Sequence, residues 1–339
     1  MIEGTSRRGA SARRVARAVA LGILVSALVT LLSRIGVFAG WEARAVDTFV
    51  FLRERRAGPE IVLVAIDDDD FQRLGERQPL PRDYLADLAE FLLESGARVV
   101  AMDIAARVST DPAADARLVA VSERAAGSGR GRLVFAGTAR PRTEGGTERY
   151  AMAEPFSAAL RARLGFSNAP VGSEGVIRRM TPVLPSVDGG FLPSFALAAL
   201  AGWDEASSRA LDGALRSASG ALVLPIRIAG GGIDERRAIS VAALSGAPWR
   251  VDFAGPPGTI TAFPSGPLVQ MARSGVKPGA DNPFAGRIAI IGATFAESRD
   301  STRRPRDSWL ARRSRPTWCT RSCPVGWAQL PTGGSIWRF

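Results

Sequence analysis

The sequence contains no histidine, one lysine (Lys277) and two cysteines (Cys319 and Cys323) among its 339 residues. Without histidine there is no histidine-based catalytic triad, no histidine metal ligand and no unperturbed side chain that titrates near neutral pH. Because there is no second cysteine pair, the two cysteines do not form a complete zinc-binding set. We therefore expect no metal and no cofactor.

Motifs that carry catalysis or nucleotide binding are also missing. The sequence has no Walker A loop, no G-x-G-x-x-G fingerprint and no G-x-S-x-G nucleophile elbow. No paired acid and base for proton transfer stands out either. The sequence by itself therefore gives no evidence for catalytic activity.

The formal net charge of +11 is concentrated at the two ends of the chain. Residues 1–17, a basic segment, have a net charge of +4, and residues 301–339 have a net charge of +7. Together they account for the whole excess, so residues 18–300 are neutral. A nucleic-acid groove would require a basic patch on the folded body. We therefore expect no nucleic-acid partner.

An apolar segment, residues 18–38, follows the basic amino terminus. Its length is close to the ~20 residues that span a bilayer, and Arg17 and Arg34 can reach the interfaces with their long side chains. Two interpretations are open: an uncleaved transmembrane helix, which the length favours, and a signal peptide cleaved near Val37–Gly40. In both, the arginine cluster stays in the cytoplasm, and the chain after Trp41 is exported across the inner membrane.

Two apolar runs that end in acidic residues predict the centre of the fold. Residues 60–67 and 98–103 each have the pattern of a strand buried on both faces. Between them, leucines at helical spacing follow Arg82, and Gly96 ends this pattern, which predicts a helix. This order of elements is typical of a parallel crossover. Residues 287–291 repeat the buried-strand pattern.

The middle of the chain has a mixed pattern. Residues 140–150 are predicted to be a polar loop or the start of an excursion, and residues 165–169 and 176–184 resemble a pair of strands. Residues 192–201 predict a buried helix, and short strands separated by glycine and proline follow. We therefore predict an α/β fold with a mostly parallel central sheet flanked by helices, an additional antiparallel part, and one preceding transmembrane helix.

Several phrases of the sequence occur together in one known family. They are, in order, WEARAVD from residue 41, IVLVAIDDDDFQRLG from 61, LPRDYLADLAEFLLESGARVVAMDI from 80, SEGVIRRMTPVLP from 173, FLPSFALAALAG from 191, VDFAGPPGTITAFPSG from 251 and FAGRIAIIGAT from 284. In this order they resemble the type 2 CHASE domain, and we assign the domain to residues 41–300. The resemblance implies an extracytoplasmic sensory domain, of the kind associated with bacterial cyclases, histidine kinases and serine/threonine kinases.

The last segment, residues 301–339, does not continue the family pattern. It has no helical or strand periodicity and contains both cysteines and four of the seven tryptophans. It is either a disordered basic tail or the product of a shifted reading frame. Because a one-base shift over residues 301–326 can restore the family's continuation, we hypothesise a frameshifted truncation whose output domain is absent. An intact in-frame gene ending at Phe339 would contradict this hypothesis.

Candidate ligand-binding residues lie near predicted strand ends. They are Asp67, Asp68, Asp103, Arg178, Arg179 and Thr294. The three carboxylates are expected at the carboxyl ends of neighbouring parallel strands, where open α/β sheets bind ligands. The two arginines can pair with them or bind an anion, and the threonine follows a glycine turn that can approach a ligand. The simpler explanations are stronger: capping for the carboxylates, solvation for the arginines and turn formation for the glycine.

The favoured function is that of a membrane-anchored extracytoplasmic sensory module of a bacterial signal-transduction protein. Its expected partners are the membrane and an unknown small-molecule or periplasmic signal, with homodimerisation left open. One alternative is an exported, membrane-anchored α/β enzyme with an Asp-rich cation site. Another is an envelope protein that only contacts partners. A small molecule that stabilises the protein without being turned over would favour the sensor. Turnover would favour the enzyme, and the absence of any small-molecule stabilisation would favour the envelope protein.

Overall fold

The computed structural model describes most of the chain before its last forty-odd residues. Described are residues 4–38, 40–41, 44–45, 48–49, 58, 60–128, 131–144, 146–170, 177–203, 205–217, 220–226, 235–246, 248–252, 254, 258–279, 282–295 and 327–329. The chain divides into two compact units, Met1–Arg53 and Glu54–Phe339.

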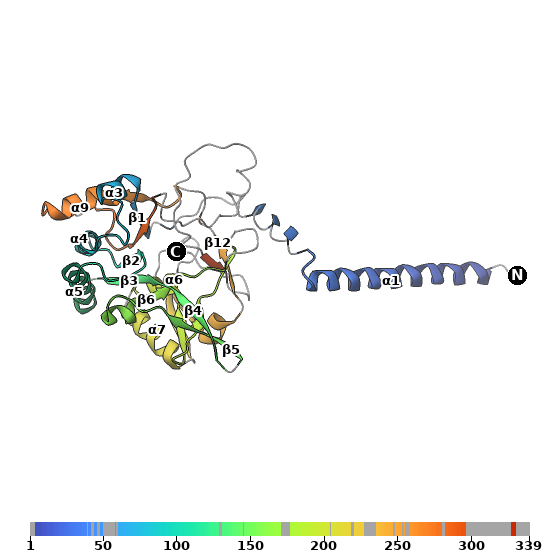
Figure 1. The fold of residues 1–339 in the computed structure, drawn as a ribbon. Helices are drawn as coiled ribbons and strands as arrows, with labels where there is room; N and C mark the ends of the chain where they lie inside the picture. The colour runs from blue at the N-terminus through green and yellow to red at the C-terminus, as the bar shows by residue number, and fades with distance from the viewer. Residues whose placement is uncertain are drawn as a thin grey trace. The chain divides into compact units, whose positions relative to one another are not determined.

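The first unit is dominated by one long helix, α1 (Gly4–Arg34), drawn in blue in Figure 1. Its portion Val15–Arg34 is long and apolar enough to cross a membrane, and none of it is buried. The hydroxyl of Thr30 donates to the carbonyl of Ser26 at 2.7 Å, which satisfies a polar group inside the apolar stretch. The helix thus fits the predicted span in length and composition, a test that a signal sequence also passes.

Six parallel strands form the central sheet of the second unit. In spatial order they are β13 (Ala262–Pro264), β1 (Ile61–Ile66), β14 (Ile288–Ala293), β2 (Val99–Asp103), β3 (Arg132–Gly137) and β6 (Leu164–Phe166). Each strand pairs in parallel with its neighbours. This sheet confirms the predicted α/β class.

Strand β14 lies between β1 and β2. Its Ile291 is paired with Val64 on one side and with Met102 on the other. All three strands are rich in aliphatic residues and buried, as is usual for central strands of a parallel sheet. The expectation that β1 and β2 are neighbours is therefore wrong, because a strand from much later in the sequence inserts between them.

Helices cover both faces of the sheet (Figure 1). One face carries α3 (Asp68–Arg73), α4 (Arg82–Glu94), α5 (Pro112–Ser128) and α9 (Ser265–Arg273), and the other carries α6 (Phe195–Ala201). Val62 and Val64 of β1 pack in the same core as Leu85 of α4. Ile61 packs in the core that contains Phe195 of α6. This division follows from the two-residue period of a strand.

The remainder of the second unit contains short antiparallel strands. The pairs are β4 (Ala139–Glu144) with β5 (Thr147–Met152), β8 (Val183–Pro185) with β9 (Phe191–Pro193), β10 (Ala221–Ile226) with β11 (Glu235–Ser240), and β12 (Trp249–Asp252) with both β7 (Arg179–Met180) and β15 (Trp327–Gln329). The remaining helices are η1 (Ala158–Arg163), α7 (Glu205–Ser217) and α8 (Val241–Ser245). The predicted antiparallel part is confirmed.

Three local predictions differ from the structure. Strand β6 pairs with β3, and β7 pairs with β12, so the expected pairing of residues 165–169 with residues 176–184 is wrong. Helix α6 begins at Phe195 because the hydroxyl of Ser194 caps it. Residues 140–150 were predicted to be a polar loop or the start of an excursion; of these, residues 140–144 and 147–150 lie in the antiparallel pair of β4 and β5.

Within residues 301–339 the structure describes only the short strand β15. It pairs with β12 so that Ala328 lies opposite Val251. The rest of the segment, including both cysteines, lies outside the described residues. Its assignment as a frameshifted or disordered tail stays a prediction.

Candidate functional site

The carboxyl edge of the sheet gathers several of the predicted site residues. Asp67 follows β1, Asp103 is the last residue of β2, and Thr294 follows β14, which lies between those two strands. In the register of the sheet, Gly292 of β14 is opposite Asp103. The structure therefore brings these side chains to one edge, as the sequence predicts.

These side chains are engaged within the fold. A carboxylate oxygen of Asp67 accepts a backbone N–H of α3 at 2.9 Å and so caps that helix. Thr294 donates its backbone N–H and its hydroxyl to the carbonyl of Ile66, at 2.8 and 3.2 Å. Asp68, which is exposed, and Asp103 also have interaction partners. Capping, the simpler explanation for the carboxylates, thus describes Asp67, and a ligand-binding role stays a prediction.

Arg178 and Arg179 lie in the antiparallel part of the fold. Arg179 pairs with Arg250 of β12, and the carbonyl of Arg178 accepts the N–H of Val251 at 3.0 Å. Arg178 has a further interaction partner as well. The two arginines therefore lie at the small sheet of β7 and β12, whereas the three carboxylates lie at or just after the ends of β1 and β2.

A buried network beside the carboxyl edge escaped the sequence analysis. Asp70 is 2% exposed. One of its oxygens accepts the hydroxyl of Ser265 at 2.5 Å and the N–H of Gly266 at 3.0 Å, and the other accepts Arg73 at 2.7 Å. The hydroxyls of Ser265 and Tyr84 are 2.7 Å apart. Asp70 thus caps the first turn of α9 from a different helix, α3.

This network leaves little room around Tyr84 and Gly266. Burial raises the pKa of Tyr84 from 10.0 to about 12; the hydrogen bond with Ser265 opposes this rise, and the charge of Asp70 adds to it. A Cβ atom at Gly266 would collide with the Asp70 carboxylate and the Arg73 guanidinium. The network therefore fixes the packing of α3, α4 and α9.

Arg82 is a second buried charge at this edge and is 1% exposed. It donates to the carbonyls of Ala105 and Val108 at 3.5 and 3.2 Å, and its guanidinium lies 5.1 Å from the ring centre of Phe156. Its Nε lies 3.7 Å from Oδ1 of Asp115, and among the described residues neither atom has a hydrogen-bond partner. Burial lowers the pKa of Arg82, and the charge of Asp115 raises it. Arg82 thus holds the loop after β2.

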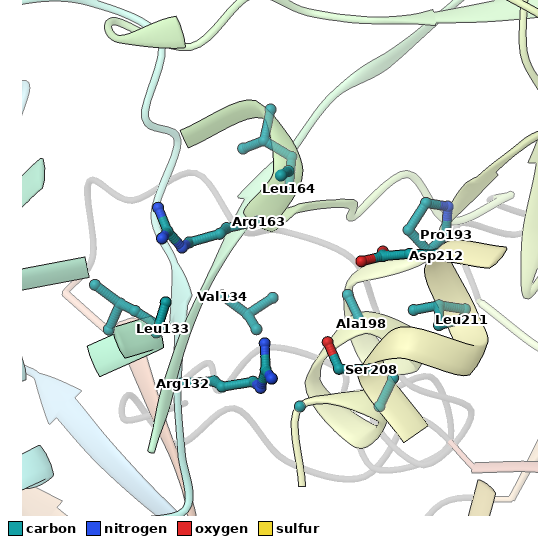
Figure 2. A pocket seen from close by; sticks show the side chains of 14 residues that line it. Arg132, Leu133, Val134, Arg163, Leu164, Pro193, Ala198, Ser208, Leu211 and Asp212 are labelled. Atoms are coloured by element: carbon teal, nitrogen blue, oxygen red, sulfur yellow. The ribbon is translucent and has the colours of Figure 1, made fainter. Parts of the chain in front are cut away.

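A pocket of about 70 Å³ lies at the opposite, amino-terminal edge of the sheet. Its walls come from the starts of β3 and β6, the end of η1, and the helices α5, α6 and α7 (Figure 2). Its polar side chains are Arg132, Arg163, Ser208 and Asp212. Apolar side chains, among them Val134, Leu164 and Leu211, make up most of the remaining wall.

Arg132 and Asp212 face the middle of this pocket in Figure 2. Arg132 is half-buried and Asp212 is exposed, and neither side chain has a hydrogen bond or ion pair in the part of the chain that the structure describes. Partial burial raises the pKa of Asp212, while the charges of Arg216 and Arg132 lower it. Arg132 is therefore close enough to influence Asp212 but does not contact it.

The second arginine of the pocket, Arg163, extends away from its middle (Figure 2). It donates to the carbonyl of Ala159 at 3.1 Å. Burial lowers its pKa, the charge of Glu123 raises it, and the charge of Arg132 lowers it. Arg163 is thus held by its own helical turn, which leaves Arg132 as the cation that faces the open space.

Comparison with known proteins gives one result. The family model of the CHASE2 domain matches residues 21–316. The chain belongs to the CHASE2 family. CHASE2 domains are sensory and not catalytic, and they are the extracytoplasmic part of signalling proteins. No curated protein and no solved structure matches the chain.

The match covers the second half of α1 and the whole sheet of the CHASE2 domain. It reaches residue 316, beyond the boundary at residue 300 that the sequence analysis gives to the sensory domain. Within the described residues, no three or more histidine, cysteine, aspartate or glutamate side chains are grouped to hold a metal ion. The Asp-rich cation site of the enzyme alternative has no counterpart in that part of the chain.

The pocket residues of this CHASE2 domain were not predicted from the sequence. Arg132 is the first residue of β3. Asp212 lies in α7, a helix that was not predicted from the residue pattern. A weak signal for Asp212 exists, because α7 has apolar residues at Ala210, Leu211 and Leu215 that define one face. The apolar face of α7 does not indicate which strand the helix packs against.

Proposed function

We propose that this chain is the membrane-anchored, extracytoplasmic sensory module of a bacterial signal-transduction protein whose output domain lies outside the sequence. The observation that carries this proposal is the CHASE2 match together with one unburied apolar helix, Val15–Arg34, which precedes the sheet domain in the sequence. Arginines at 13, 14 and 17 precede the apolar part, and such clusters stay on the cytoplasmic side. The sheet domain then faces the periplasm.

Signalling requires that the sensory domain have two arrangements that a ligand binds with different affinity. The pocket between β3, β6, α6 and α7 supports this role, because it is lined by both charges and apolar groups. Occupation of the pocket would favour one arrangement of these helices, and the anchor would carry the change across the membrane. No catalytic step is needed.

Topology is tested with reporters fused to the carboxyl end of the full chain. Alkaline phosphatase, which is active only after export, is expected to be active, and β-galactosidase, which is active only in the cytoplasm, is expected to be inactive. Replacing Arg13, Arg14 and Arg17 with glutamate should reduce export, because the charge bias is lost. A matched variant with three lysines should behave like the parent. An active galactosidase fusion on the parent chain would contradict the proposed orientation.

The anchor itself is tested by the mass of the protein in the membrane fraction. A chain that retains residues 1–38 is expected, because α1 is longer than the apolar core of a signal peptide. A soluble periplasmic product that begins near Ala39 would contradict the anchor and leave the exported position of the domain intact.

A further inference from the structure

Two charged side chains that face the pocket, Arg132 and Asp212, are separated and form no ion pair with each other. Arg132 and Asp212 face the same space, the charge of Arg132 lowers the pKa of Asp212, and no ion pair joins them in the described part of the chain. A half-buried guanidinium normally has a carboxylate or a carbonyl partner, because the loss of water must be offset. The arrangement is therefore a positive and a negative group with an open gap between them.

The size and walls of the gap restrict what can fill it. About 70 Å³ is room for a few ordered waters or one small molecule, well below the ~300 Å³ or more of a drug-sized site. The wall from α6 and the glycine that follows it presents small residues, Ala198, Ala201 and Gly202, and the opposite wall presents Val134 and Leu164. A ligand with one small apolar group fits this lining, and a ligand with a large side chain does not.

Charge decides between the small molecules that remain. A simple anion would satisfy Arg132 but would leave Asp212 unpartnered beside a second negative group. A simple cation would satisfy Asp212 and face Arg132. A molecule with a carboxylate at one end and an ammonium group next to it satisfies both side chains at once, and Arg132 can donate two parallel hydrogen bonds to the carboxylate. Ser208 adds a neutral hydroxyl to the same wall.

We propose that the pocket binds a small α-amino acid, whose carboxylate is held by Arg132 and whose ammonium group is held by Asp212. The other titratable groups around the pocket do not alter this assignment. Arg163 is bonded to the carbonyl of Ala159 and influenced by Glu123, and Arg216 acts on Asp212 from the same helix. This inference rests on the proposed sensory function, because it names the ligand that the sensor would detect.

The test is calorimetric titration of the full chain in detergent micelles with glycine and L-alanine. Both are expected to bind in the millimolar range or more tightly, and acetate, lactate and methylammonium at the same concentrations are not. Arg132→Gln and Asp212→Asn should each weaken binding about tenfold or more, because each removes a charge-assisted hydrogen bond. Ala198→Leu should also abolish binding, because it fills the pocket without removing a charge.

Arg161→Gln is the matched control, because Arg161 lies on the same helical turn as Arg163 but pairs with Glu154 at the surface, 2.6 Å away. It should bind like the parent. If Arg132→Gln does not fold, Arg132→Lys keeps the charge and loses the two parallel bonds, and it should still weaken binding. The proposal is overturned if neither amino acid binds, if acetate or lactate binds as well as alanine, or if the pocket variants bind like the parent. The reporter fusions need no ligand, so an exported reporter with no amino-acid binding would overturn this inference alone.

Discussion

The two edges of the parallel sheet use their charged side chains differently. At the carboxyl edge, Asp67 caps a helix, Asp70 bonds two donors at the start of α9, and Arg82 is enclosed beside Asp115. At the amino-terminal edge, Arg132 and Asp212 face a pocket and have no ion-pair partner among the described residues. Side chains that bond to the rest of the fold stabilise it, whereas side chains that face a pocket without such a bond are available to a ligand. The comparison predicts large stability effects at the first edge and small ones at the second.

The largest effect is expected from Arg82→Ala. Removal of the guanidinium would leave the buried carboxylate of Asp115 without its cation, with only Ser109 and the backbone N–H of Thr110 as donors. Breaking a buried ion pair costs about 3–5 kcal/mol of unfolding free energy. Chemical denaturation of the full chain in detergent measures this loss. The double variant Arg82→Met with Asp115→Leu should recover most of it, since no lone charge remains. Equal stability of Arg82→Ala and the parent would show that this charge does not support the loop.

A somewhat smaller loss is expected from Asp70→Ala. The variant leaves the buried hydroxyl of Ser265 and the N–H of Gly266 without their acceptor, and hydrogen bonds to a charged group contribute about 1.5–3 kcal/mol each. We expect a loss of about 2–4 kcal/mol in the same denaturation experiment. Asp69→Ala, which removes an exposed carboxylate from the same turn, should change stability by less than about 1 kcal/mol. Similar losses in both variants would contradict a specific role for Asp70.

Alkaline pH should destabilise the same edge through Tyr84. Its pKa is raised from 10.0 to about 12 in the folded chain, so below pH 10 both states keep the phenol proton and stability is unaffected. Between pH 10 and 12 the unfolded state loses the proton first, and the folded state should lose about 2–3 kcal/mol of stability.

Tyrosinate absorbance and denaturation, followed from pH 9 to pH 12 in a Tyr150→Phe background, isolate this titration, because the chain has two tyrosines. Tyr84→Phe should remove the pH dependence. A Tyr84 that ionises at its ordinary value in the folded chain would contradict the buried network.

The smallest effects on stability are expected in the pocket. Arg132→Gln and Asp212→Asn should each change the unfolding free energy by less than about 0.5 kcal/mol, because neither side chain has a partner to lose. Asp212→Asn should be slightly stabilising at neutral pH, since burial raises the pKa of that carboxyl and so disfavours its charged form. This gain should vanish below the ordinary pKa of an aspartate, where both states are protonated. A loss of several kcal/mol in either variant would mean that the two edges do not differ.

Part of the fold was predictable because its signals are local. The buried runs of β1, β2 and β14, the amphipathic α4 and its end near Gly96, and the long apolar helix are all visible in the residue pattern. The pairing of short strands was not, because β6 and β7 are only three and two residues long and carry no pattern that specifies a partner. The same holds for the candidate site. The capping role of Asp67 could be predicted from its position after a strand, whereas the pocket could not be predicted from the sequence.

The sequence by itself determined the apolar helix that is long enough to cross a membrane, the α/β class, the neutral body and the CHASE2 resemblance, because each depends on composition, on periodicity or on the order of short motifs. Only the tertiary structure decided that β14 separates β1 from β2, that Asp70 caps α9, and that Arg132 faces Asp212 across a pocket. These are contacts between residues far apart in the chain. A continuous apolar strand buried on both faces has no polar side to fix its neighbours, so its partners are selected by packing in three dimensions.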